Sequence, residues 1–271
     1  MRIKTIVLVL VILLSACRPT EKSLKFVVIP TEDATTTRQQ WRAIVDYLST
    51  GLDRKVELLT ASDFTAVVEA MKYGHADMAW FGPASYVIAV DEGADIEPIV
   101  AGVHVSSGLP GYYSVLIALA DTDVSDLSKL TFGFVDVSST SGYIIPSAYL
   151  EEIGIEPREI LIAGTHGAVI LAVQNRSVDV GAVAEHLVRE AIKQGVLNER
   201  EFQVVWQSEL IPECPVVVQA TMPQETKDEL IELFLNVPSD VMQDVMTASG
   251  FVKTDDAAYD PIRKIIHHKD R

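Results

Sequence analysis

The sequence predicts an α/β fold with two lobes. Short apolar segments alternate with segments in which apolar residues recur every three or four positions, a pattern typical of parallel β-α-β units. The alternation supplies about twice the material of one doubly wound unit. Because the sequence has no strong internal repeat and no Gly/Ser-rich linker, we expect two lobes joined by crossover strands, each with a mixed, mostly parallel sheet covered by helices.

The first part of the expected fold alternates strands and helices three times. Residues 24–29 form a short apolar run closed by Pro30, which is consistent with a buried strand. Beyond it, apolar side chains from Trp41 to Leu48 share one helical face, and Gly51 supplies a stop signal. The strands expected here are residues 24–29, 56–59 and 76–81, and the helices are centred on residues 41–48, 63–73 and 83–90.

The alternation resumes after residue 112 and continues to the end of the chain. We place lobe 1 at residues 24–112 plus 217–271 and lobe 2 at residues 113–216. The expected strands are residues 113–119, 130–135, 159–163, 178–183, 202–206 and 216–220, and the expected helices are 142–153, 168–175, 187–194, 224–235 and 239–249.

The chain is acidic, with 22 Lys and Arg against 38 Asp and Glu and a formal net charge of −16. A surface of this sign repels phosphate backbones, so nucleic acid is not an expected partner. An anionic ligand therefore has to be captured by a local arrangement that acts against the overall field. With 48% hydrophobic and 22% charged residues, the composition excludes a disordered or fibrous chain.

The first seventeen residues are typical of an export signal. Two cations, Arg2 and Lys4, precede an apolar run of about nine residues, which is too short to span a bilayer. The sequence LSAC that ends at Cys17 resembles the bacterial lipobox, in which the cysteine is acylated and becomes the mature N-terminus. We expect a signal peptide at residues 1–16 and a lipid-anchored leash at residues 17–23, outside the cytoplasmic membrane. The alternative is an ordinary secretory signal with a chance cysteine.

The richest cluster of hydroxyl side chains lies where a predicted strand passes into a predicted helix. Ser139, Thr140 and Ser141 stand near the start of that helix, where backbone N–H groups are free and carry a partial positive charge. Hydroxyls and free N–H groups together can surround a tetrahedral oxyanion without any Lys or Arg. The alternative is simple N-capping, which needs only one hydroxyl.

The remaining candidates for chemistry are isolated. His166 precedes an apolar helix and is either a capping residue or a ligand contact, and the pair His267 and His268 lies in a charged tail. With Cys17 lipidated, Cys214 has no disulfide partner, and we interpret it as a small apolar filler. The sequence has no metal-ligand spacing, nucleophile elbow, P-loop or zinc-protease motif, so we expect no cofactor, no metal and no enzymatic activity.

Three segments together resemble one family. They are ADMAWFGPASY at residues 76–86, STSGY at residues 139–143, and His166 followed by AVQNRSVD at residues 172–179. The chain is similar to the phosphonate/phosphite-binding periplasmic proteins of ABC importers. The resemblance implies a type II periplasmic-binding-protein fold, a small phosphorus oxyanion held between the lobes, and an ABC permease as the partner of a monomer. The residues it implies for ligand binding are Phe64, Trp80, Tyr112, Ser139, Thr140, Ser141, His166, His186 and Cys214.

Three positions depart from the pattern of members that bind aminoalkylphosphonates. The resemblance implies Tyr, an acid and Asp at these positions in those members, whereas this chain has Phe64, His186 and Cys214. A desolvated ammonium group needs such acceptors. We therefore expect phosphite, methylphosphonate or phosphate. Glu185 or Glu213 could restore a carboxylate if the register slips by one. An alternative role, a ligand-sensing lipoprotein that reports to a membrane receptor, is equally compatible with the sequence.

Overall fold

The computed structural model describes residues 22–31, 34–104, 108–242 and 248–269. The predicted signal peptide and the lipidation site at Cys17 lie outside the described residues. Within the described ranges, no helix is both long enough and apolar enough to cross a bilayer.

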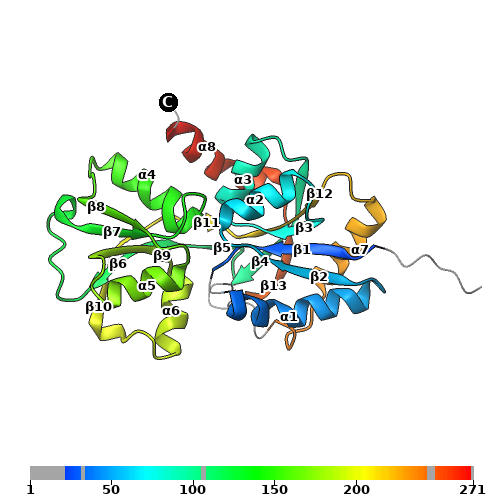
Figure 1. Cartoon of the computed structure of the whole chain (residues 1–271), viewed down its shortest axis with the longest axis horizontal. Helices are drawn as coiled ribbons and strands as arrows, with labels where there is room; N and C mark the ends of the chain where they lie inside the picture. The colour runs from blue at the N-terminus through cyan, green and yellow to red at the C-terminus, as the bar shows by residue number, and fades with distance from the viewer. Residues whose placement is uncertain (1–21, 32–33, 105–107, 243–247, 270–271) are drawn as a thin grey trace, which may run out of the picture.

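The described residues form two α/β lobes that lie side by side (Figure 1). Lobe 1 contains a six-stranded sheet in the order β13-β4-β12-β3-β1-β2, and lobe 2 contains a five-stranded sheet in the order β10-β6-β9-β7-β8. Among the described strands, four of six in lobe 1 and four of five in lobe 2 run in one direction. The predicted mixed sheets are confirmed; among the described strands, two of the five neighbouring pairs in lobe 1 and two of the four in lobe 2 are parallel.

Lobe 1 is built as the hydrophobic pattern requires. Helix α1 buries the predicted face from Trp41 to Leu48, and Asp63 caps α2 because its Oδ1 accepts the Ala66 N–H at 2.7 Å. The strands are β1 Leu24–Val28, β2 Val56–Thr60, β3 Met78–Trp80, β4 Ile96–His104, β12 Pro215–Gln219 and β13 Ala248–Lys253, and the helices are α1 Ala34–Gly51, α2 Phe64–Lys72, α3 Pro83–Asp91, α7 Gln224–Leu235 and α8 Asp260–Lys269.

Lobe 2 contains the predicted alternation with small shifts at the element ends. Its strands are β6 Ser114–Leu119, β7 Thr131–Phe134, β8 Glu159–Ile162, β9 Val180–Ala184 and β10 Phe202–Gln207, and its helices are α4 Ile145–Glu152, α5 His166–Gln174 and α6 Glu185–Lys193.

Two short crossover strands join the lobes. Strand β5 Gly111–Tyr112 pairs antiparallel with β11 Ile211–Pro212, and both lie where the chain passes between the sheets (Figure 1). Strand β12 of lobe 1 begins at Pro215, two residues before the lobe boundary expected at residue 217. The return to lobe 1 is therefore slightly earlier than the sequence pattern indicates.

One sequence-based expectation near the C-terminus is wrong. The helix expected at residues 239–249 is a turn over residues 239–242, and Ala248 and Ser249 belong to β13; residues 243–247 lie outside the described ranges. The charged tail that carries His267 and His268 forms helix α8. Both histidines are exposed, as expected for a solvated surface. Earlier in the chain, strand β4 at residues 96–104 has no counterpart among the expected strands.

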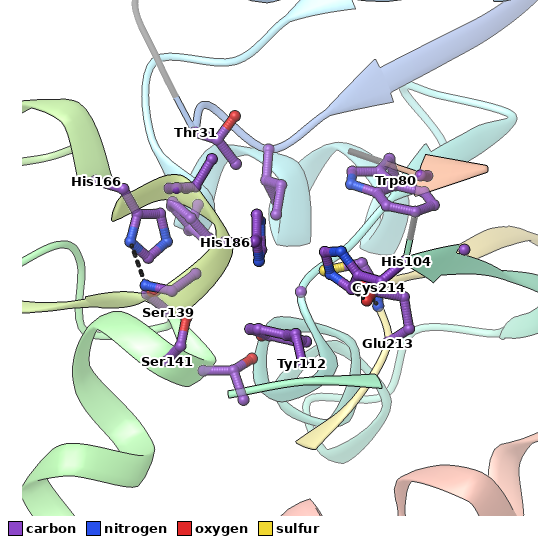
Figure 2. A pocket seen from close by; sticks show the side chains of 18 residues that line it. Thr31, Trp80, His104, Tyr112, Ser139, Ser141, His166, His186, Glu213 and Cys214 are labelled. Atoms are coloured by element: carbon purple, nitrogen blue, oxygen red, sulfur yellow. Dashed lines mark hydrogen bonds and ion pairs between the residues drawn. The ribbon is translucent and has the colours of Figure 1, made fainter. Parts of the chain in front are cut away.

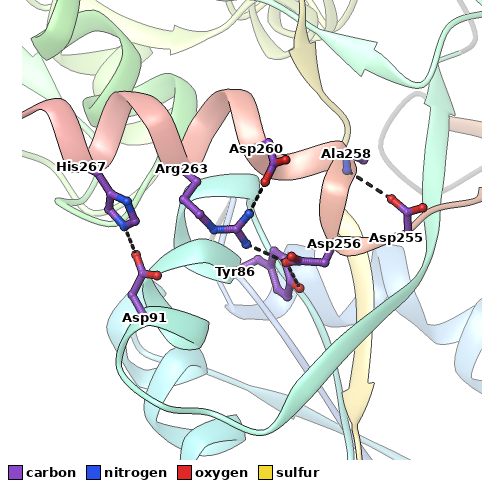
Figure 3. A network of polar contacts seen from close by, with 8 residues as sticks. All are labelled: Tyr86, Asp91, Asp255, Asp256, Ala258, Asp260, Arg263 and His267. Carbon is purple, nitrogen blue, oxygen red and sulfur yellow. Dashed lines mark hydrogen bonds and ion pairs between the residues drawn. The ribbon is translucent and has the colours of Figure 1, made fainter.

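Helix α8 is attached to α3 by a polar network (Figure 3). The Tyr86 hydroxyl donates to Asp256 at 2.7 Å, and the Arg263 guanidinium bridges Asp256 and Asp260. One turn further on, His267 Nε2 lies 2.8 Å from an Asp91 carboxylate oxygen. These contacts fix α3, whose first turn reaches the space between the lobes.

Candidate functional site

A cavity of about 40 Å³ lies between the lobes, and side chains from both lobes line it (Figure 2). This volume holds roughly three water molecules, which is the scale of a small anion. The structure brings all nine sequence-predicted site residues to this one cavity. Lobe 1 and the crossovers contribute Phe64, Trp80, Tyr112 and Cys214, and lobe 2 contributes Ser139, Thr140, Ser141, His166 and His186.

The Ser/Thr cluster belongs to a single π-helical turn, Thr140–Ile144, that leads into α4. Helical structure therefore begins at Thr140, two residues before the start expected at residue 142. The Ser139 hydroxyl accepts the Gly142 N–H at 3.2 Å, and the backbone N–H groups of Thr140 and Ser141 have no hydrogen-bond partner among the described residues. These two N–H groups remain available to an anion.

Gly142 allows this turn to pack against the end of β7. A Cβ atom at this position would overlap the Val135 side chain, so the close approach requires glycine. On the other side, the Ser114 hydroxyl donates to the Ser141 carbonyl at 2.7 Å and attaches the turn to β6. The positions of Thr140 and Ser141 are thus fixed by two neighbouring strands.

The Thr140 hydroxyl connects the two lobes. Its Oγ1 accepts the Ala84 N–H of α3 at 2.8 Å, and the residue is only 2% exposed. A hydroxyl that accepts one hydrogen bond still has its own hydrogen to donate. Ser139 and Thr140 therefore act partly as caps, as the alternative interpretation required, yet each retains a donor.

His166, the first residue of α5, is a neutral donor. Its Nδ1 accepts the Ala184 N–H at 3.3 Å, and burial lowers the pKa of the imidazole to about 4. At neutral pH the ring is uncharged, and because Nδ1 accepts, the single proton resides on Nε2. His166 can therefore donate to an oxyanion without adding a net charge to the site.

The opposite end of the cavity contains a buried His/Glu group (Figure 2). His104 Nε2 and Glu213 Oε2 lie 2.9 Å apart, with both side chains at least nine-tenths buried, and the other Glu213 oxygen accepts the Cys214 N–H at 3.0 Å. The His186 ring lies 4.5 Å from the His104 ring, centroid to centroid. Burial, reinforced by the neighbouring Glu213, raises the pKa of the Cys214 thiol, which is therefore uncharged.

Sequence reasoning missed His104 and left Glu213 undecided. The structure places Glu213 in the cavity lining, whereas Glu185 is not among the lining residues and pairs with Arg189 at 2.7 Å. A carboxylate is therefore present one position before Cys214; it accepts a backbone N–H through one oxygen and lies beside the His104 ring with the other. The available signal for His104 was its place at the carboxyl end of a strand, but β4 itself had not been predicted.

The electrostatics of the cavity favour an anion despite the acidic chain. Helices α3, α5 and α6, each of nine residues, begin at the cavity, where Gly82, His166 and Ala184 line it. Their positive ends attract negative charge. Among the described lining residues there is no Lys or Arg, and the described His, Cys, Asp and Glu side chains form no group suited to a metal ion.

Residues 26–259 match the family described as ABC transporter, phosphonate, periplasmic substrate-binding protein. The phosphonates-binding periplasmic protein of Escherichia coli K12 is 30% identical over 80% of this chain and 66% of its own length, a little under two thirds. The phosphate-import protein PhnD of Mycolicibacterium smegmatis is 29% identical over 97% of this chain and 94% of its own length. The crystal structure of a binding protein component of an ABC phosphonate transporter from Pseudomonas aeruginosa has a TM-score of 0.82 at 29% identity, over 92% of this chain and 86% of that one.

Proposed function

We propose that this chain, which belongs to the periplasmic substrate-binding proteins of phosphonate ABC transporters, captures a small phosphorus oxyanion outside the cytoplasmic membrane and delivers it to a permease. The role is binding without catalysis, in keeping with the relatives, whose names describe binding or import. Among the three candidate ligands, phosphite, methylphosphonate and phosphate, the common recognition element is a tetrahedral phosphorus centre with at least three oxygens.

The observation that carries the proposal is the group of neutral donors at one end of the cavity. Three hydroxyls, two free backbone N–H groups and the His166 Nε2–H come together there with the helix ends. Hydrogen bonds to a charged group contribute about 1.5–3 kcal/mol each. A dissociation constant between micromolar and nanomolar corresponds to about 8–12 kcal/mol, which several such bonds can supply.

The contact between Thr140 and Ala84 links binding to closure of the lobes. In the described structure the two lobes meet through this hydrogen bond at the wall of the cavity. A ligand held by lobe 2 that also contacts lobe 1 binds the closed arrangement more tightly than an open one, and so shifts the population toward it. The closed arrangement is the form that a permease would recognise.

A 2-aminoethyl group finds little support in this cavity. The one carboxylate among the described lining residues, Glu213, is already paired with His104 and with the Cys214 N–H. An ammonium group would have to share this carboxylate with the His104 ring beside it, which reduces the benefit of the contact. The cavity volume of about 40 Å³ also leaves little room for a tail.

Calorimetric titration of the purified protein tests this function. We expect phosphite, methylphosphonate or phosphate to bind with micromolar or tighter affinity and 2-aminoethylphosphonate to bind weakly. Heats near zero for all four compounds would contradict the proposed function. Submicromolar binding of 2-aminoethylphosphonate alone would preserve the transport role and overturn the ligand assignment.

Anchoring through Cys17 is a separate part of the proposal and rests on the lipobox-like sequence LSAC. In cells grown with an alkyne-labelled fatty acid, we expect the wild-type chain to incorporate the label and Cys17→Ser to lose it. Cys214→Ser is the matched control and should incorporate label as the wild type does. Equal labelling of the Cys17→Ser variant would show that another residue, or none specifically, is acylated.

A further inference from the structure

His186 is a buried polar side chain in the cavity whose hydrogen bonding is incomplete. It is 8% exposed, it lines the cavity at the start of α6, and its Nδ1 has no hydrogen-bond partner among the described residues (Figure 2). Buried polar atoms in folded proteins nearly always have partners, and an orphaned one calls for an explanation. A bound ligand that completes the hydrogen bonding is such an explanation.

The surroundings keep His186 uncharged. Burial lowers the pKa of its imidazole well below the usual value, and His104, His166 and Arg189 act in the same direction. The ring packs edge-to-face against Tyr112, with centroids 5.6 Å apart, and near His104, which is paired with Glu213. A neutral imidazole has one N–H donor and one acceptor nitrogen, and the tautomer decides which nitrogen is which.

The position of His186 relates it to one particular part of a tetrahedral ligand. In Figure 2 it lies between the end formed by Ser139, Ser141 and His166 and the end formed by His104 and Glu213. An anion that presents three oxygens to the hydroxyls and N–H groups directs its fourth substituent away from them. That substituent therefore faces His186 and the His104–Glu213 pair.

We propose, building on the proposed function, that His186 is a specificity-determining residue that contacts a protonated fourth oxygen, so that inorganic phosphate is the preferred ligand. A P–OH group both donates and accepts, so it satisfies Nδ1 of His186 in either tautomer. The hydrogen of phosphite and the methyl group of methylphosphonate do neither, and would leave a buried nitrogen unpaired. The buried Glu213 carboxylate nearby disfavours a fourth oxygen that carries a full charge, which further favours the protonated form.

The ligand ranking of the wild-type protein is the first test. We expect phosphate to bind about tenfold or more tightly than phosphite, methylphosphonate and sulfate in calorimetric titrations at neutral pH. Sulfate has the size of phosphate but no proton at this pH, so it separates protonation from fit. Binding of phosphite, methylphosphonate or sulfate as tight as that of phosphate would overturn the assignment and leave the proposed function standing. Absence of binding by all four would overturn both.

Two variants test the residue itself. His186→Phe keeps a planar ring without nitrogen atoms, and we expect it to weaken phosphate binding by about tenfold or more while methylphosphonate changes by less than about threefold. His186→Asn, which returns a polar atom near the Nδ1 position, should restore part of the phosphate preference. His268→Phe makes the same change at an exposed site of α8 and should alter nothing. An equal loss for phosphate and methylphosphonate in His186→Phe would identify a merely structural role and overturn the inference.

Discussion

Removing the hydroxyls of Thr140 and Ser141 together is expected to weaken oxyanion binding by about a hundredfold. Each hydroxyl contributes about 1.5 kcal/mol or more when it donates to a charged ligand, and two such losses amount to roughly a hundredfold in the dissociation constant. Thr140→Ala also removes the acceptor of the Ala84 N–H and so disfavours the closed arrangement. The measurement is calorimetric titration of Thr140→Ala/Ser141→Ala with whichever oxyanion binds the wild type most tightly.

The stability of the empty double variant distinguishes a binding role from a structural one. Loss of the bond between Thr140 and Ala84 should lower the free energy of unfolding by about 1 kcal/mol, which corresponds to a decrease of a few degrees in Tm for a chain of this size. Ser125→Ala/Ser128→Ala removes two exposed hydroxyls from the same lobe and serves as the control. Unchanged affinity in the Thr140/Ser141 variant, whatever the change in its Tm, would show that the hydroxyls only cap the turn.

The position of the Ser/Thr cluster could be predicted because it depends on local sequence. A buried strand, β7, followed by four consecutive hydroxyl residues and Gly142 places free N–H groups and hydroxyls at the same point in any α/β fold. What the local sequence does not contain is the partner of Thr140. Ala84 lies 56 residues earlier in the other lobe, and its contact depends on how the lobes close.

The residues at the His104 end of the cavity could not be predicted because an irregular strand positions them. Strand β4 contains Pro98, and a proline lowers the expectation of a strand, particularly of a central one. The sheet accommodates it with a bulge: Val216 pairs with Val100 and Val217 with Pro98, so that Ile99 is passed over. Because this strand ends at His104, the histidine and its pair with Glu213 could not be located from the sequence.

The failure at residues 239–249 has a different cause. Val241, Met242 and Val245 have the three- and four-residue spacing of a helical face, yet Ala248 pairs with His104 of β4 and Ser249 lies in the bulge that follows. Pairing with a strand some 150 residues earlier in sequence is a tertiary preference, and it overrides local periodicity.

The free energy of unfolding of the ligand-free protein is expected to fall by about 3 kcal/mol through His166 alone as the pH falls from 6.5 to 4. The unfolded chain protonates this histidine near pH 6.5, whereas burial keeps the pKa of the folded form at about 4. Between these values the unfolded state binds more protons, so stability rises with pH. The contribution of His166 to the free energy of unfolding is fully present above pH 6.5 and is lost as the pH falls toward 4. Burial also lowers the pKa of His186, which adds a loss of the same sign. Urea titrations at stepped pH measure the slope.

A variant isolates the contribution of His166 from that of the carboxylates. His166→Asn places an amide oxygen near the former Nδ1, where it can still accept the Ala184 N–H, but the side chain no longer titrates. Its unfolding free energy should depend less on pH between about 6.5 and 5, where Asp and Glu in the unfolded chain remain mostly ionised. His268→Asn, an exposed control, should keep the wild-type slope. If His166→Asn also kept that slope, His166 would have to be protonated in the folded state, and its role as a neutral donor to the oxyanion would be untenable.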